Sequence, residues 1–580
     1  KTAFIHLDGS TQDSVISVIQ ALWREQLAAD DEVPLWVLHK RAEYISTIPC
    51  YLRSPESQAV LDAYEKTDGA LYRQPHIGQR GGVVVAPFSY EEFLRADDAG
   101  VLHLLAHYAG YDPKPRDFLI GGEREVGSQL REASSRNPSR FLRLLTSYWS
   151  SISTEFSNSI MDGAANYLAY RHGNLRTNAN WVAVEESNPQ SLANQIIDEL
   201  ERHSAHWRHN RSAANALKSC AHVIEDTQTA ERLVFLSLGF LNLNEESSVH
   251  GDSVDLLTVG INMMTGSVVE ALMILANYFL ENNIAFPELL SPTLLQFAGK
   301  EHPALRALIL RRLPYLQSKS PELGWKLFDR AMESSSGLWA SAEPCLYYAY
   351  RKDFEKVSAL LERLQNEGDR EDFETWGRIS ALSALAGHIK LADLIEELNR
   401  LSIAEAWQGA VSVWTHVDNI RQHRDQCLVG IEAGLKTCSD NALVVAQKTM
   451  SLFRSPTPSI SIPIEIVKLY FSVLEADSGN SYHRDFGFNE WLNSTSQRDP
   501  ELSLSAVEIY LNYVNHYDQP SLYDYDNQLV QLVTRLFAEA EEREEADNGA
   551  MLKRVVSVQD LLLSLGVNSI DEWLKSAERQ

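Results

Sequence analysis

Residues 303–316 read PALRALILRRLPYL, and this stretch carries the pattern that predicts the fold. Its apolar residues recur at spacings of three and four, which places them along one side of an α-helix; they are Leu305, Leu308, Ile309 and Leu313. Three arginines surround this apolar stripe. A proline opens the stretch, and proline is favoured in the first turn of a helix because the N–H that it lacks has no partner there. The sequence here predicts an amphipathic helix with one buried side.

The same signals recur along most of the chain. Apolar residues with helical spacing fill 14–28, 90–108, 139–170 and 190–209, and final helices are predicted at 528–546 and 559–565 with a short cap at 570–577. Helix starts are predicted at Asn137-Pro138, Asn188-Pro189, Ser291-Pro292, His302-Pro303, Ser320-Pro321 and Asp499-Pro500. The main extended candidate is GGVVVAP at 81–87. These patterns predict an all-α protein.

The region after residue 303 has the spacing of a helical repeat. Helix pairs are predicted to begin at Pro303 and Pro321, Leu338 and Asp353, Phe373 and His388, and Ala404 and Ile420. The step is about 32 to 36 residues, which is the range of tetratricopeptide-like units, although no strict consensus fits these segments. One pair cannot bury its apolar side alone, so neighbouring pairs must stack. We therefore expect an α-solenoid of degenerate TPR/HEAT-like helix pairs.

Clusters of proline and glycine mark the predicted domain boundaries. They lie at 71–87, 111–122 and 453–463. At 580 residues the chain exceeds the size at which a single hydrophobic core keeps growing, so it should divide into domains or extend as an array. We predict an N-terminal helical entry segment at 1–86, a helical middle region at 87–300, and a helical-repeat array with a C-terminal cap at 301–580.

Composition excludes several classes of function. The formal net charge of −27 opposes direct nucleic-acid binding, because such binding depends on Lys and Arg that neutralise phosphates. The five cysteines are far apart and form no CxxC pair, so no zinc site or disulfide framework is predicted. No apolar run reaches the roughly 18 residues that span a bilayer, and no signal peptide is recognisable, so we expect a cytoplasmic protein without membrane contact. Because the chain begins at Lys1, we expect it to be part of a longer polypeptide.

Motifs that would indicate catalysis are scarce. The sequence GGEREVGS at 121–128 has the glycines of a phosphate-binding loop but no lysine, and it carries two glutamates. His103 and His107 have the spacing of a helical metal pair, although two partly buried histidines on an apolar helix are the interpretation that we favour. A second set, His203, His206 and His209, is spaced by three residues and does not converge on a helix. We therefore predict no catalytic, cofactor-binding or metal-ligating residue in this region.

Aromatic residues fall into two groups. Trp325, Trp376 and Trp407 are predicted to be core residues between helices. In LYRQPHIGQR (71–80) and YHRDFGFNEW (482–491), aromatic residues lie instead beside Arg and His, a combination typical of protein interfaces. The candidate partner-binding residues are Tyr72, Arg73, His76, Arg80, Tyr482, Arg484, Phe486 and Trp491. Ordinary surface turns with packed aromatic rings are the other interpretation of both segments.

Several strings together resemble a known family. They are PFSYEEFL (87–94), LLAHYAGY (104–111), NPSRFLRLL (137–145), ERHSAHWRHNRSAANAL (201–217), AEPCLYYAYRKDF (342–354) and ETWGRISALSAL (374–385). Over 1–577 the chain resembles the C-terminal sensor region of bacterial antiviral STAND NTPases, the AVAST family, which are similar to eukaryotic NLR receptors. The likeness lies in overall pattern, so no functional residue is carried over from the family.

The resemblance implies a function for the chain. In that family an effector and an ATPase precede a helical sensor, which binds a phage protein such as the portal or the large terminase subunit. Recognition drives assembly of the full-length protein into a homotetramer and activates the effector. The resemblance thus implies a bacterial sensor module that is not itself an enzyme, with ATP and magnesium bound only in the ATPase region. The alternatives are a generic helical-repeat scaffold for host proteins, or an enzyme with a metal site near His103 and His107.

Overall fold

The computed structural model divides the chain into two compact units, Lys1–Val84 and Val85–Gln580. It describes residues 4–22, 33–71, 84–111, 119–173, 175–177, 180–245, 255–333, 337–454, 460–476, 487–516, 522 and 524–567. The division falls two residues before the predicted end of the entry segment. The regions predicted as 87–300 and 301–580 both belong to the second unit.

The helices in the described residues up to Ala298 are α1 (Gly9–Ala21), α2 (Leu35–Ser46), α3 (Pro55–Asp68), α4 (Tyr90–Arg95), α5 (Asp98–Tyr108), α6 (Glu123–Arg136), α7 (Pro138–Ser147), α8 (Thr154–His172), α9 (Pro189–Arg202), α10 (Ser204–Trp207), α11 (Arg211–Ala221), α12 (Thr227–Leu238), α13 (Leu256–Asn262), α14 (Met264–Glu281) and α15 (Leu290–Ala298). Short 3-10 helices cover Phe4–His6, Cys50–Leu52, Trp149–Ser151, Arg370–Asp372 and Tyr525–Asn527.

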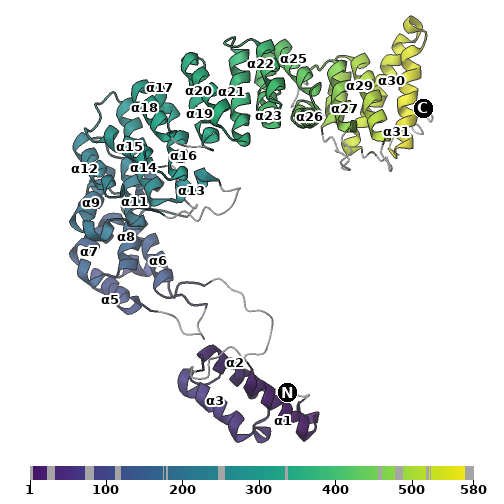
Figure 1. The fold of residues 1–580 in the computed structure, drawn as a ribbon. Coiled ribbons are helices and arrows are strands. Elements are labelled where there is room, and N and C mark those ends of the chain that lie inside the picture. The colour runs from purple at the N-terminus through teal and green to yellow at the C-terminus, as the bar shows by residue number, and fades with distance from the viewer. Residues whose placement is uncertain are drawn as a thin grey trace. The chain divides into compact units, whose positions relative to one another are not determined.

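The later helices are α16 (Pro303–Arg312), α17 (Pro314–Lys319), α18 (Pro321–Ala331), α19 (Trp339–Ala349), α20 (Phe354–Glu367), α21 (Phe373–Leu385), α22 (Leu391–Leu401), α23 (Ala404–Trp414), α24 (Val417–Gln422), α25 (Arg424–Leu435), α26 (Ser439–Phe453), α27 (Ile464–Ala476), α28 (Phe488–Ser496), α29 (Pro500–Asn515), α30 (Gln528–Asp547) and α31 (Ala550–Ser564). Figure 1 shows these elements along the ribbon.

The prediction of an all-α protein is confirmed for the described part of the chain, which contains no strand. The predicted extended segment at 81–87 forms one isolated parallel bridge there, between Val85 and Ile120. Long helical segments break where polar residues cap a new helix. The predicted helix at 90–108 is two helices, because the Asp97 side chain accepts a hydrogen bond from Gly100 N (2.8 Å) at the start of α5.

Most predicted helix starts after residue 300 lie at or near helix starts in the structure, but the last helix, predicted at 559–565, begins at Ala550 and ends at Ser564. Successive first helices of the predicted pairs begin at Pro303, Trp339, Phe373 and Ala404, which lie 36, 34 and 31 residues apart. The predicted helix at 303–316 is divided, because α16 ends at Arg312 and the short helix α17 begins at Pro314, which cannot continue the hydrogen bonding of the preceding helix. The predicted start at Ile420 falls inside a second short helix, α24, and α25 begins at Arg424. The predicted 570–577 cap lies outside the described residues. The tryptophans predicted for the core, Trp325, Trp376 and Trp407, are buried.

Helices α21 and α23 show how the first helices of successive pairs pack. A Cβ atom on Gly377 would lie 2.0 Å from the backbone oxygen of Ala406, and one on Gly409 would lie 2.0 Å from the oxygen of Glu374. Only glycine permits this separation of the two backbones. Side-chain pairs run in the same order along both helices, Glu374 with Gln408 and then Arg378 with Ser412, so the helices are parallel.

The first unit has its own small core. Helix α2 packs on α3, and Ala42, Ile45, Leu61 and Tyr64 form an apolar cluster between them. The Tyr64 hydroxyl donates to Asp68 Oδ2 (2.7 Å).

Length and apolar content limit which helices in the described residues could cross a membrane. No single helix there is both long and apolar enough to cross a membrane. Only α13 and α14, taken together across an 86° bend, reach the required length and composition. Helix α14 buries most of its side chains and contacts α11 and α16.

Candidate functional site

Seven of the eight predicted partner-binding residues lie outside the described residues: Tyr72, Arg73, His76, Arg80, Tyr482, Arg484 and Phe486. The eighth, Trp491, is only 2% exposed. Its indole Nε1 donates to Ile460 O (2.9 Å), and its ring packs against Phe453 and Phe488. Because Phe488 opens α28, Trp491 falls on the apolar side of that helix one turn later. This corrects the expectation of an exposed binding residue at Trp491, which is part of the core.

The first of the two histidine sets named in the sequence analysis lies on α5. His103 and His107 lie on α5 with the expected spacing, but both are exposed, which corrects the expectation that they are partly buried. The His107 ring packs against Tyr108 and Tyr111. Among the described residues no group of three or more His, Cys, Asp or Glu has the arrangement of a metal site.

In the second set His203 and His206 both pack on Trp149, whereas His209 has other partners. His203 Nδ1 lies 2.7 Å from Glu199 Oε1, and its ring stacks on Trp149 at 3.8 Å between centroids. His206 is 3.4 Å from Ser157 Oγ. His209 Nε2 lies 2.9 Å from Gly239 O at a backbone φ of +58°. The three rings therefore do not converge, as the sequence spacing predicted.

The GGEREVGS segment forms the start of α6. Gly122 N donates to Glu125 Oε2 (3.0 Å), and Gly110 N donates to Glu123 Oε2 (2.9 Å). Carboxylates at a helix start satisfy amides that lack partners within the helix. Both glutamates of this segment therefore accept hydrogen bonds from backbone N–H groups, which are then not available to a phosphate.

A buried carboxylate joins three helices in the earlier part of the second unit. Glu270 on α14 accepts from Lys218 Nζ on α11 (2.5 Å) and from Arg312 Nη2 on α16 (2.5 Å). Burial opposes ionisation of this group, but the hydrogen bonds and charges of the two cations outweigh it and lower the pKa of Glu270. The ionised side chain therefore links the three helices side to side.

A second polar chain joins α19, α21 and α23. Arg378 Nη1 on α21 donates to Glu343 Oε2 on α19 (2.5 Å), and Arg378 Nη2 donates to Glu374 Oε1 (2.5 Å). Glu374 in turn accepts from Gln408 Nε2 on α23 (3.1 Å). Burial lowers the pKa of Arg378, but the two glutamates more than offset it and the pKa is raised. The side chains that link these helices lie between 32 and 35 residues apart in sequence.

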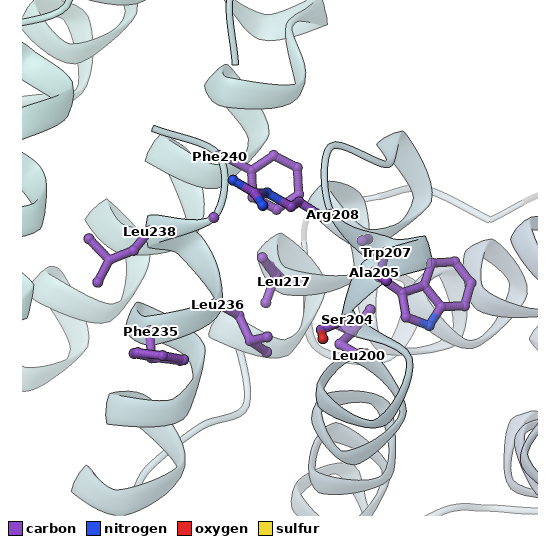
Figure 2. A pocket seen from close by; sticks show the side chains of 12 residues that line it. Leu200, Ser204, Ala205, Trp207, Arg208, Leu217, Phe235, Leu236, Leu238 and Phe240 are labelled. Carbon is purple, nitrogen blue, oxygen red and sulfur yellow. The ribbon is translucent and has the colours of Figure 1, made fainter. Parts of the chain in front are cut away.

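An apolar pocket of about 530 Å³ lies among α9, α10, α11 and α12 (Figure 2). Its lining residues are Leu200, Ser204, Ala205, Trp207, Arg208, Ala213, Leu217, Phe235, Leu236, Leu238, Gly239 and Phe240. Phe235 on α12 is 65% exposed, and Arg208 is also exposed and forms no ion pair with a described residue. Figure 2 shows Phe235 and Leu200 on opposite walls. Such a pocket suits an apolar side chain of a partner, with Arg208 beside it for a carboxylate.

This pocket could not be predicted from the sequence, because its walls come from separate helices. Six of its lining residues belong to the string ERHSAHWRHNRSAANAL, which stood out in the sequence for its histidine spacing and its family resemblance. The other wall comes mainly from α12, and in the sequence of that helix Phe235 is not distinguished from the apolar residues that are buried. The only available signal was that a phenylalanine lies off the apolar stripe formed by Ala230, Leu233 and Val234.

Comparisons with known proteins do not assign the chain to a group. No model of a protein family, no curated protein and no solved structure matches it. The functional conclusions below therefore depend on the chain's own residues and on the resemblance stated above.

Proposed function

We propose that this chain is the protein-binding sensor module of an antiphage STAND NTPase, an α-solenoid that recognises a phage structural or packaging protein such as the portal or the large terminase subunit. The observation that carries the proposal is the polar linkage of helices α19, α21 and α23 at sequence separations of 32 to 35 residues. This spacing is that of stacked helix pairs, which present long surfaces to other proteins.

Two further features support protein recognition. The pocket beside Phe235 can accept an apolar anchor of a partner, and such anchors provide most of the binding free energy at protein interfaces. Stable recognition of a folded protein also needs roughly 800 Å² per partner, which a stack of helices supplies more readily than a single cleft does. In the full-length protein, binding would then promote homotetramer assembly and effector activation, with ATP and magnesium bound in the ATPase region.

The test is co-expression of the chain with individual phage proteins, followed by size-exclusion chromatography. We expect one stable complex, either with a portal or with a large terminase subunit. Phe235→Asp should weaken that complex by at least about tenfold, since it places a charge where an apolar anchor docks. The matched control is Val429→Asp, which changes another exposed apolar residue, on α25. Failure to form a complex with portal, terminase and capsid proteins alike would reject the proposal.

A genetic observation separates this proposal from the generic scaffold. A GxxxxGK[ST] motif followed by an acidic strand, encoded within the same polypeptide, would agree with a STAND ATPase. Its absence from the full-length protein would favour a scaffold that binds host proteins. Stoichiometric metal in the purified chain, lost in a His103→Ala variant, would instead favour the enzyme alternative.

A further inference from the structure

The turns between helices form two edges of opposite charge in the region 303–453. The turns that follow α16, α19, α21 and α23, taken with the adjoining helix ends and the short helices α17 and α24, cover 311–319, 347–356, 386–393 and 415–425, and we call them the basic edge. They contain nine Lys or Arg and five Asp or Glu. The turns that lead into α19, α21, α23 and α26 cover, in their described residues, 332–333 with 337–338, 367–373, 402–405 and 436–440, and we call them the acidic edge. They contain two Lys or Arg and seven Asp or Glu.

Contacts between the turns show that the basic edge is continuous. Cys345 Sγ near the end of α19 lies 3.3 Å from Leu310 O near the end of α16. The ring of Phe354, after α19, stacks on that of His388, after α21, at 4.7 Å between centroids. Helices α21 and α23 are parallel, so the ends of these two helices also lie together. The four turns therefore belong to one side of the stack.

The acidic edge is joined in the same way. Arg370 Nε, before α21, donates to Glu405 Oε2 at the start of α23 (2.9 Å). Thr437 Oγ1, before α26, donates to Asn399 Oδ1 near the end of α22 (3.2 Å). The charge difference therefore separates two opposite sides of the same helices.

Most cations on the basic edge form no ion pair with a described residue. Arg312 pairs with Glu270, Lys356 with Asp329 and Arg424 with Asp425. The other six form no ion pair with a described residue; they are Arg311, Lys319, Arg351, Lys352, Lys390 and Arg421. Unpaired cations in a chain of net charge −27 are where an anionic partner would be attracted.

Exposed tyrosines lie among these cations. Tyr347 is 47% exposed and Tyr348 is 63% exposed, at the end of α19. Their rings contact each other edge to face at 5.2 Å between centroids. Tyr350 is buried, and its hydroxyl accepts from Arg351 Nε (2.9 Å), which holds the exposed Arg351 guanidinium beside this tyrosine pair. Tyr and Arg exposed together are typical of binding surfaces for proteins.

We propose that the basic edge docks an acidic segment of a protein partner, whose carboxylates meet Arg351, Lys352 and Lys390 while an apolar side chain packs on Tyr348. The five carboxylates interspersed along the edge would repel a continuous phosphate backbone, whereas they leave room for separately placed Asp and Glu side chains. Protein is therefore favoured over nucleic acid. This inference rests on the proposed protein-binding function and specifies one surface for it.

The test variant reverses three charges: Arg351→Glu, Lys352→Glu and Lys390→Glu. These residues lie at or just before the starts of α20 and α22, where a carboxylate is compatible with the helix, so the fold should be retained. The matched control reverses three exposed cations elsewhere, Arg124→Glu, Lys468→Glu and Lys553→Glu, and so changes the net charge equally. Circular dichroism and thermal unfolding check both proteins. A third variant, Tyr348→Ala, removes the exposed ring alone.

Two fluorescein-labelled probes are compared by fluorescence anisotropy. One is a peptide of alternating Glu and Leu with a central Trp, and the other is a single-stranded oligonucleotide of equal net charge. We expect the native chain and the control to bind the peptide alike, the edge variant to bind it at least about tenfold more weakly, and Tyr348→Ala about threefold more weakly. No peptide binding, equal binding by edge variant and control, or tighter binding of the oligonucleotide at this edge would each overturn the inference.

The same variants separate this inference from the proposed function. A phage-protein complex that survives the edge variant unchanged leaves the sensor function in place and rejects the basic edge as its docking surface. Edge-dependent peptide binding without any phage-protein complex supports the surface and rejects the sensor assignment.

Discussion

Helices α8, α11, α14 and α16 are linked by polar side chains that lie far apart in sequence, whereas α19, α21 and α23 are linked at short and regular separations. Asn210 and Asn158 are 52 residues apart, as are Lys218 and Glu270. The links among α19, α21 and α23 span 32 to 35 residues. In both regions one polar side chain reaches the next helix of the stack.

The difference lies in what separates the linked helices. Only α22 lies between α21 and α23, while α12, α13 and a longer connection lie between α11 and α14. Side-by-side packing of helices thus tolerates insertions, because loop-closure entropy grows slowly with loop length. A regular sequence period shows where the connections are short, and its absence does not exclude stacked helices.

The largest expected effect tests whether close backbone packing is shared by the two regions. Gly409→Val on α23 and Gly163→Val on α8 each place a side chain against a neighbouring backbone, since a Cβ would lie 2.0 Å from Glu374 O and 2.5 Å from Arg131 O. We expect each to reduce the free energy of unfolding in urea by about 3 kcal/mol or more.

Gly9→Ala is the control for this prediction, because a Cβ at Gly9 meets nothing within 4 Å. It should change stability by less than about 0.5 kcal/mol. If Gly163→Val were tolerated while Gly409→Val were not, the two regions would not be packed alike, and the comparison between them would fail.

Much of the fold was predictable from the sequence. Each X-Pro pair predicted as a helix start lies at or within the first turn of a helix, because proline supplies the helical φ and lacks the orphan N–H. Apolar spacing alone could not show that 90–108 is broken, since the break depends on Asp97 acting as a cap. The spacing of the helix starts at Pro303, Trp339, Phe373 and Ala404 could be predicted because the connections between these helices are short.

The candidate site was much less predictable. Trp491 was predicted to lie on the surface because Arg484 and other polar residues are near it in sequence. In the structure α28 begins at Phe488 and directs the Trp491 side chain into the core. The link from Lys218 to Glu270 joins residues 52 apart, and no local pattern indicates such a contact. The basic edge likewise appears only when four separate turns are known to lie on one side.

A smaller effect is expected from the polar links themselves. Glu270→Gln leaves Lys218 and Arg312 without their anion, whereas Glu343→Gln leaves Arg378 still paired with Glu374. Glu270 is the more deeply buried of the two glutamates, so its loss should cost about 1–3 kcal/mol and that of Glu343 about 1 kcal/mol. Urea unfolding at neutral pH measures both. An equal cost at the two positions would contradict the assigned difference in burial.

The pH dependence sharpens this test. The pKa of Glu270 is lower in the folded state than its ordinary value of 4.5, so the unfolded chain takes up a proton first as the pH falls. The stabilisation from this group is therefore complete above that ordinary value and is lost as the pH falls through the folded-state pKa. Glu270→Gln should lose less stability on acidification than the native chain does.

The smallest expected effect has the opposite sign and concerns Asp162 on α8. Burial raises its pKa above the ordinary value of 3.8, and this outweighs hydrogen bonds with Ser212 and Asn215 and the charge of Arg131, which favour ionisation. The folded state thus holds this proton more tightly, and stability falls as the pH rises from the ordinary value through the folded-state pKa. Asp162→Asn removes the ionisation while keeping a polar group beside Ser212. We expect it to stabilise the protein at pH 7 by about 1 kcal/mol or less and to flatten this part of the pH profile. Destabilisation at pH 7 would show instead that the Asp162 carboxylate links α8 to α11 as Glu270 links α11 to α16.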